Sequence, residues 1–138
     1  MADLAPLHLL FETAQGTWAV PAALAEEVVE LGSPREVPGT PPHVRGLLVL
    51  RGELLPVLDL EVLQGRPAGP VGPRGVLVRT GGGAMVLIAR KVLGFEAVAP
   101  APPLGASGLE QHLRGPVAIG SRQVLALDAE GLGAWLAG

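Results

Sequence analysis

Residues Val44–Leu60 read VRGLLVLRGELLPVLDL. An apolar run ends at the pair Arg51-Gly52, and a second apolar run follows it closely. Short runs of Val and Leu on either side of a tight turn are typical of a β-hairpin. The stretch therefore predicts two neighbouring strands, near Arg45–Leu50 and Leu54–Leu58, joined at that pair.

The same order of elements returns later in the chain. Arg114–Leu132 aligns with Arg45–Leu63 at an offset of 69 residues and matches it at six of nineteen positions. A weaker similarity pairs Leu9–Val20 with Val76–Leu87 at an offset of 67 residues. Similar segments at a nearly constant offset indicate repeated structural units. We therefore expect one domain over residues 1–138, made of two related β-units that each take about half of the chain.

Short apolar runs bounded by Gly and Pro predict a mainly β protein. Strands are expected near His8–Thr13, Thr17–Val20, Val28–Leu31, Arg45–Leu50, Leu54–Leu58, Gly75–Arg79, Ala84–Ala89, Phe95–Val98, Pro116–Ile119 and Val124–Leu127. Helices are expected over Ala22–Glu27 and Ala129–Ala137, with a single turn at residues 41–43 and surface loops over Gln64–Arg74 and Ala99–Gly108. Strands this short and numerous favour two small closed barrels.

Composition excludes several classes of protein. The chain has 138 residues, of which 49% are hydrophobic and 3% aromatic, and its net charge is -3. That apolar content indicates a packed globular domain, and the acidic balance with few aromatic side chains argues against a nucleic-acid partner. Charged or turn residues interrupt every apolar stretch, so no membrane insertion is expected. With no cysteine and no basic leader, the expected compartment is the cytoplasm.

The candidate catalytic groups do not form a recognisable set. The histidines His8, His43 and His112 lack metal-site spacing, and no serine lies in a nucleophile elbow, so we expect no cofactor, no metal and no enzymatic activity. Asp59 and Asp128 end equivalent predicted strands. Paired carboxylates can perform acid–base chemistry, but an Asp between a strand and a short helix is favoured as an N-cap.

Val44–Leu60 also resembles the signature of the CheW family, the adaptor domains of bacterial chemosensory arrays used in chemotaxis. The matching positions are Gly46, Leu50, Arg51, Gly52, Pro56, Val57, Asp59 and Leu60. The remaining segments resemble their family counterparts in the same order. The resemblance implies two five-stranded SH3-like β-barrel subdomains packed side by side, with short helices that include a C-terminal one.

The resemblance further implies a function and a surface. CheW-like domains couple the cytoplasmic tip of methyl-accepting chemoreceptors to the regulatory domain of a CheA-type histidine kinase, at the inner face of the membrane, and perform no chemistry themselves. Arg51 and Gly46 would belong to the receptor-binding surface, with Val28 and Glu30 beside them. We expect Gly46 to let a partner helix approach the backbone, and Arg51 to pair with Glu30 when no receptor is bound.

Two alternatives remain open at this stage. The same module also serves chemosensory pathways that control pilus motility or gene expression. A small-molecule-binding barrel or an undetected hydrolase would instead be favoured by an enclosed cavity lined by Asp59 or His43. The chain departs from the family at Arg90, where members often carry Asp, and this reversed charge leaves any partner contact there in doubt.

Overall fold

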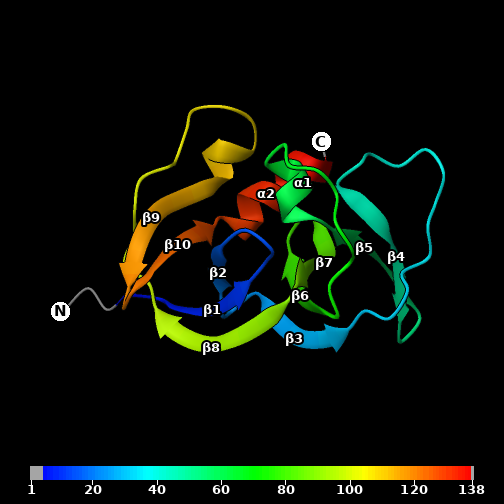
Figure 1. Ribbon diagram of the computed structural model, residues 1–138, viewed down its shortest axis with the longest axis horizontal. Helices are drawn as coiled ribbons and strands as arrows, with labels where there is room; N and C mark the ends of the chain where they lie inside the picture. Colours follow the sequence, from blue (N-terminus) through cyan, green and yellow to red (C-terminus); the bar gives the residue numbers. More distant parts are fainter. Residues whose placement is uncertain (1–4, 138) are drawn as a thin grey trace.

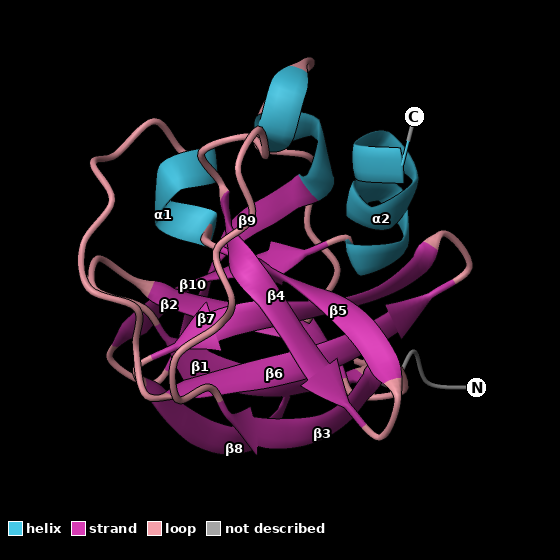
Figure 2. Ribbon diagram, turned by 90° about the vertical axis from the view of Figure 1, so that its right-hand side faces the viewer, coloured by secondary structure: helices cyan, strands magenta, loops and turns pink. Residues whose placement is uncertain are grey.

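The computed structural model describes residues 5–137, which form two β-sheets with short helices at one end (Figures 1 and 2). The strands are β1 (Leu7–Glu12), β2 (Thr17–Pro21), β3 (Ala25–Glu30), β4 (Val44–Leu50), β5 (Glu53–Leu58), β6 (Arg74–Thr80), β7 (Gly83–Ala89), β8 (Lys91–Ala97), β9 (Leu113–Ile119) and β10 (Arg122–Leu127). The helices are α1 (Leu60–Leu63), the 3-10 helix η1 (Gly108–His112) and α2 (Ala129–Ala137).

Each sheet has five strands. Sheet 1 has the order β8-β1-β2-β10-β9, and sheet 2 has the order β3-β6-β7-β5-β4. The two sheets lie side by side in Figure 1, with sheet 1 on the left. Neighbouring strands are antiparallel except for β2 with β10 and β5 with β7, which are parallel. The expected mainly β fold with two five-stranded units and a C-terminal helix is confirmed.

The sheets do not divide the chain at its midpoint. The hairpin β1-β2 joins β8, β9 and β10 in sheet 1, whereas β6-β7 joins β3, β4 and β5 in sheet 2. The two hairpins that carry the most similar sequence segments, β4-β5 and β9-β10, hold the same edge position in their sheets. We therefore propose that the chain contains two repeats, and that the first hairpin of each repeat belongs to the sheet formed mainly by the other repeat.

No hydrogen-bonded ladder closes either sheet within residues 5–137, so the edges are protected in other ways. Single bridges place Arg35 against Leu47 beside β4, and Pro103 against Arg114 beside β9. Bridges of this kind satisfy part of an edge that would otherwise be open to another chain. Closure of the units therefore depends on side chains and connecting loops.

The expected helix over Ala22–Glu27 is wrong. Residues 22–24 form a turn, in which the amide of Leu24 donates to the carbonyl of Pro21 at 3.0 Å, and β3 begins at Ala25. Pairing with β6 and burial of Val29 outweigh the helix propensity of the alanines and glutamates. The sequence reading also missed η1, which buries Leu109 in a segment next to the expected loop.

The largest apolar cluster spans both sheets. Phe11 and Trp18 of sheet 1 and Val76 and Leu87 of sheet 2 belong to it, together with Leu132 of α2, and each of these side chains is at most 1% exposed. Because both sheets contribute to one core, neither can open without exposing apolar surface of the other.

Replacing the most deeply buried phenylalanine tests this shared core. Phe11→Ala should lower the free energy of unfolding by about 3 to 5 kcal/mol, because it removes a large side chain from a packed interior. Urea denaturation followed by circular dichroism should show a single transition, and amide hydrogen exchange should accelerate in both sheets. Val49→Ala, at a 62% exposed position, is the control and should change stability by less than about 0.5 kcal/mol. Loosening of sheet 1 alone would contradict a common core.

Candidate partner-binding surface

Arg51 occupies an unfavourable backbone conformation at the tip of the β4-β5 hairpin. Leu50 pairs with Glu53, which leaves Arg51 and Gly52 as a two-residue turn with φ values of 50° and 81°. Positive φ at both central residues is the pattern of a type I′ turn, which favours Asn or Gly at its first position. Arg51 is the one non-glycine residue with positive φ within residues 5–137. Residues in sparsely populated backbone regions cluster at functional sites, which makes Arg51 a candidate functional residue.

The Arg51 guanidinium points into solvent and meets β3. Its side chain is 64% exposed and forms an ion pair with Glu27, with the second contact, Nη1 to Oε2, at 3.5 Å. Hydrogen bonding to Glu27 raises the pKa of Arg51 above its ordinary value. The expected partner Glu30 is wrong, because Glu30 lies three residues, about 10 Å, further along the strand.

A second arginine ties together three strands of sheet 2. Arg79 on β6 donates from Nε to Glu26 on β3 at 2.6 Å, and from Nη1 and Nη2 to Glu53 on β5 at 2.9 Å each. Hydrogen bonds from Arg79 lower the pKa of Glu26 and of Glu53 below the ordinary value. Since β7 separates β6 from β5 in the sheet, these contacts require sheet 2 to curl strongly at this end. We call Glu26, Glu27, Arg51, Glu53 and Arg79 the charged cluster.

Val28 and Glu30 lie on β3 beyond the charged cluster. Both side chains are exposed, with Val28 at 41%, while Val29 between them is buried. Figure 2 shows the tip of β4-β5 at the end of the molecule opposite the helices, on the same side as β3. Of the four residues expected on the partner surface, Val28, Glu30 and Arg51 are therefore exposed. They lie on β3 and on the β4-β5 turn, which the Arg51–Glu27 ion pair connects.

The expectation that Gly46 leaves room for a partner helix is wrong. Gly46 is buried, and its φ of 149° lies in a region that other residues rarely adopt. A Cβ atom at this position would lie 2.8 Å from the carbonyl oxygen of Arg35 and 2.9 Å from Cβ of Pro34. The close approach is therefore made by the protein's own segment, which also bridges to Leu47.

The sequence reading missed an apolar patch on the outer face of β4-β5. Val49 and Leu54 are cross-strand partners that are 62% and 64% exposed, and the next outward pair, Leu47 and Pro56, is half-buried. Because the run Leu47–Leu50 is apolar throughout, composition alone does not separate its core face from its outer face. Strict alternation along the strand would have indicated that one face of this run lies outside.

The two predicted capping carboxylates are engaged in local structure. Asp59 accepts from the amides of Glu61 and Val62 at 3.0 and 3.3 Å and pairs with Arg45 at 2.7 Å. Asp128 accepts from the amide of Gly131 at 3.1 Å. Within the described residues, no group of three or more potential metal ligands comes together, and no helix is long and apolar enough to cross a membrane.

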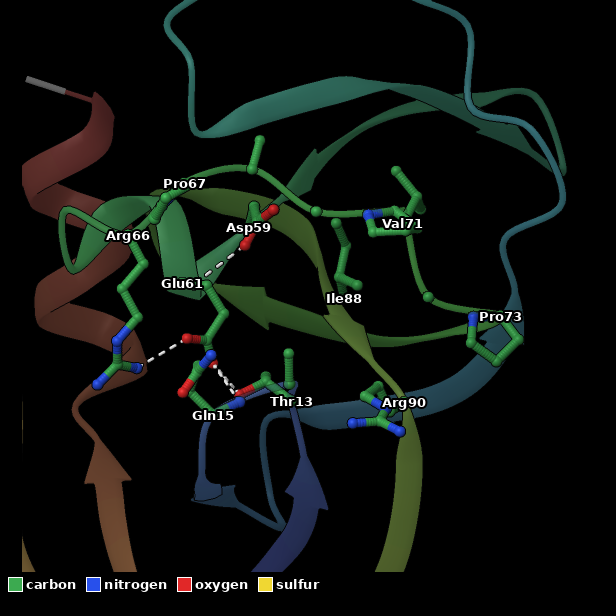
Figure 3. Close-up of a pocket in the computed structure, with 15 residues that line it drawn as sticks. Thr13, Gln15, Asp59, Glu61, Arg66, Pro67, Val71, Pro73, Ile88 and Arg90 are labelled. Carbon is green, nitrogen blue, oxygen red and sulfur yellow. Dashed lines mark hydrogen bonds and ion pairs between the residues drawn. The ribbon is translucent and has the colours of Figure 1, made fainter.

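A cavity of about 760 Å³ lies beneath the loop that follows α1, and Asp59 is among its lining residues (Figure 3). It is partly open to solvent. A smaller cavity of about 180 Å³ is lined in part by His43. No local sequence pattern indicates the larger cavity, since its walls come from segments far apart in the chain, including Thr13, Glu61, Val71 and Arg90.

The strain at Arg51 can be measured with two variants that both remove the ion pair with Glu27. Arg51→Asn should unfold with a free energy about 0.5 to 1 kcal/mol higher than Arg51→Ala, because Asn tolerates the left-handed region and Ala does not. Urea denaturation of both variants gives the difference. Equal stabilities, or a more stable Ala variant, would show that the turn places no demand on this residue.

The charged cluster predicts an acid dependence of stability. The pKa values of Glu26 and Glu53 are lowered from 4.5 in the folded state, so these groups stabilise the fold above that pH, and the contribution is lost as the pH falls through their lowered values. Arg79→Gln should therefore show a smaller loss of stability than the parent protein between about pH 6 and pH 3. Thermal unfolding at each pH is the measurement. Arg35→Gln, at another exposed arginine, should keep the parent slope, and an identical slope in Arg79→Gln would refute the assignment.

Comparison with known proteins gives one consistent result. A model of the CheW-like domain matches residues 7–136. "Protein FrzA" of Myxococcus xanthus is 35% identical over 110 residues, which cover 75% of this chain and 69% of that protein. "Probable chemotaxis protein CheW" of Rhizobium etli is 27% identical over 110 residues, covering 70% and 66%.

A solved structure supports the fold. The crystal structure of the scaffolding protein TtCheW from Thermoanaerobacter tengcongensis matches with a TM-score of 0.79 and 21% identity, over 94% of this chain and 92% of that one. A likeness of that extent shows that the two chains share the arrangement of two five-stranded sheets. With a family model that extends over almost the whole sequence, the chain belongs to the CheW-like domain family.

Proposed function

We propose that this protein is a non-enzymatic adaptor that couples the cytoplasmic tip of chemoreceptors to the regulatory domain of a CheA-type histidine kinase. Family membership supports the general role. The assignment of a surface rests on the backbone conformation of Arg51. This exposed arginine has a positive φ, which is unfavourable for most residues other than glycine and asparagine. The adaptor would act in the cytoplasm, at the inner face of the membrane through its receptor partner.

The proposed receptor surface consists of Arg51, Glu27, Val28 and Glu30. The Arg51–Glu27 pair is exposed, and pairs of this kind contribute only about 0 to 1 kcal/mol. A carboxylate on a receptor helix can therefore replace Glu27 at small cost, while Val28 supplies apolar contact. In this scheme Gly46 acts indirectly, by letting Pro34–Arg35 pack against β4 and hold the hairpin in place.

The proposed kinase surface is the apolar patch of Leu47, Val49, Leu54 and Pro56. Two neighbouring side chains that are more than 60% exposed are unusual among the large apolar residues of this chain. Contiguous exposed apolar groups commonly mark protein interfaces, and a β-rich regulatory domain offers a matching apolar face. Both surfaces would serve a swimming pathway or one that controls pilus motility or gene expression.

Two substitutions on the same hairpin separate the two surfaces. Arg51→Asn should lower the affinity for a purified chemoreceptor cytoplasmic fragment at least tenfold and leave binding to the kinase regulatory domain unchanged, because it removes the guanidinium and leaves the apolar patch intact. Leu54→Glu should do the reverse, because it places a charge in an apolar contact. Isothermal titration calorimetry with both partners from the same organism measures the four affinities.

The matched control is Leu104→Glu, which adds the same charge at a 39% exposed leucine far from β4-β5 in the sequence and should change neither affinity. Circular dichroism and thermal unfolding establish that each variant is folded. If neither partner binds the parent protein, the adaptor role itself is rejected. If Leu54→Glu weakens binding to the receptor fragment and Arg51→Asn weakens binding to the kinase domain, the adaptor role stands. The assignment of the two surfaces would then have to be exchanged.

A further inference from the structure

The cavity of about 760 Å³ has a rigid polar floor. The carboxylate of Glu61 is buried there, and accepts from Nη1 of Arg66 at 2.7 Å and from the amide of Gln15 at 3.3 Å. Thr13 donates its hydroxyl to the same carboxylate and accepts from Nε1 of Trp18 at 2.8 Å. This buried chain of hydrogen bonds fixes the floor between the β1-β2 turn and α1 (Figure 3).

The carboxylates of the cavity are largely engaged by donors of the protein itself, each accepting three hydrogen bonds. Both oxygens of Glu61 are hydrogen-bonded. Asp59 is equally occupied, by two backbone amides at Oδ1 and by Arg45 at Oδ2. Each negative charge is also compensated by an arginine, Arg66 at Glu61 and Arg45 at Asp59. A cationic ligand would therefore have to compete with these guanidinium groups.

The charged lining group without an ion pair among the described residues is a donor, Arg90. Arg90 is exposed. Its guanidinium forms no hydrogen bond or ion pair with the other residues of 5–137. The positive charge of Arg90 contributes to lowering the pKa of Glu12, after the larger effect of the hydrogen bond from Arg122. The Glu12 carboxylate itself pairs with Nη1 of Arg122 at 2.6 Å. Figure 3 places Arg90 and Arg66 on opposite sides of the floor. Among the lining residues, Arg66 and Arg90 balance Asp59 and Glu61 in number, and Arg66 is already paired with Glu61 at 2.7 Å.

The opposite wall is apolar. Ile88 of β7 and Val71, Pro67, Pro70 and Pro73 of the loop after α1 line it. The loop is held over the cavity by Arg45, whose Nη2 donates to the carbonyl of Gly69 at 2.8 Å, and by the carbonyl of Pro73, which accepts from the amide of Leu31 at 3.0 Å. A volume of this size accommodates a small organic molecule.

We propose that this cavity binds a small organic anion with an apolar body, whose acidic group pairs with Arg90 and whose carbon chain lies against Ile88 and Val71. Free donors on one side and apolar walls on the other select for that combination of charge and shape. The site is separate from the hairpin surfaces of the proposed adaptor, because none of Val28, Arg51, Val49 and Leu54 lines the cavity. Ligand binding here does not require the adaptor role.

Sodium octanoate is the probe, and octylamine hydrochloride is its cationic counterpart of equal chain length. Titration of the ¹⁵N-labelled full chain, followed by ¹H–¹⁵N correlation spectra, should show saturable shifts at Thr13, Gln15 and Arg90 with octanoate and at least tenfold weaker shifts with octylamine. Arg90→Gln should weaken octanoate binding at least tenfold. Arg35→Gln, which removes an exposed arginine that does not line the cavity, should bind as the parent does.

The spectrum of Arg90→Gln, recorded without ligand, establishes that the variant is folded. The proposal is overturned if octanoate causes no saturable shifts, if octylamine binds as tightly, or if Arg90→Gln and Arg35→Gln behave alike. Because no receptor or kinase is present, these outcomes leave the adaptor proposal untouched. Failure of both partners to bind in the calorimetric experiment would equally leave the anion site standing.

Discussion

Burial of Phe11 and Trp18 against Val76 and Leu87 is the interaction on which the other features depend. It joins two sheets that have no common backbone ladder within residues 5–137. The same cluster receives Leu132 of α2 and Leu60 of α1, so the helices are anchored by the contacts that join the sheets. The cavity floor begins at this core, since the indole nitrogen of Trp18 holds Thr13 in place.

Outside the core, arginines organise the surface of the protein. Arg79 and Arg51 draw the strands of sheet 2 together where backbone pairing ends, and Arg45 holds both the cap of α1 and the loop over the cavity. The ion pairs of Arg51 and Arg79 are exposed or half-exposed, and each contributes little to stability by itself. The pair of Arg45 with Asp59 is mostly buried. The main effect of these contacts is to set where hairpins and loops lie, which is what a binding surface requires.

Much of the fold was predictable, because Val44–Leu60 specifies a hairpin by local pattern and the other strands are short apolar runs between turn residues. The helix predicted over Ala22–Glu27 failed because pairing with β6, a long-range contact, outweighs local propensity. The partner of Arg51 and the segment packed on Gly46 were missed for a related reason: both depend on register and loop path, which spacing along the chain does not encode.

The candidate sites divide in the same way. Arg51 was found because it lies within a sequence motif, whereas the outer patch of Val49 and Leu54 and the cavity at Arg90 arise only when distant segments meet. The surroundings of Arg90 follow from the three-dimensional structure alone.

Sheet 1 combines strands from the early and late parts of the sequence, and this affects the order in which the chain can fold during synthesis. Sheet 2 is drawn entirely from residues 25–89, and it can assemble while the remainder is still being translated. Sheet 1 cannot, because β2 pairs with β10, which is the last of these strands to be synthesised. During that interval the core of Phe11 and Trp18 lacks Leu113, Leu127 and Leu132, so the amino-terminal hairpin exposes apolar surface that is prone to aggregation.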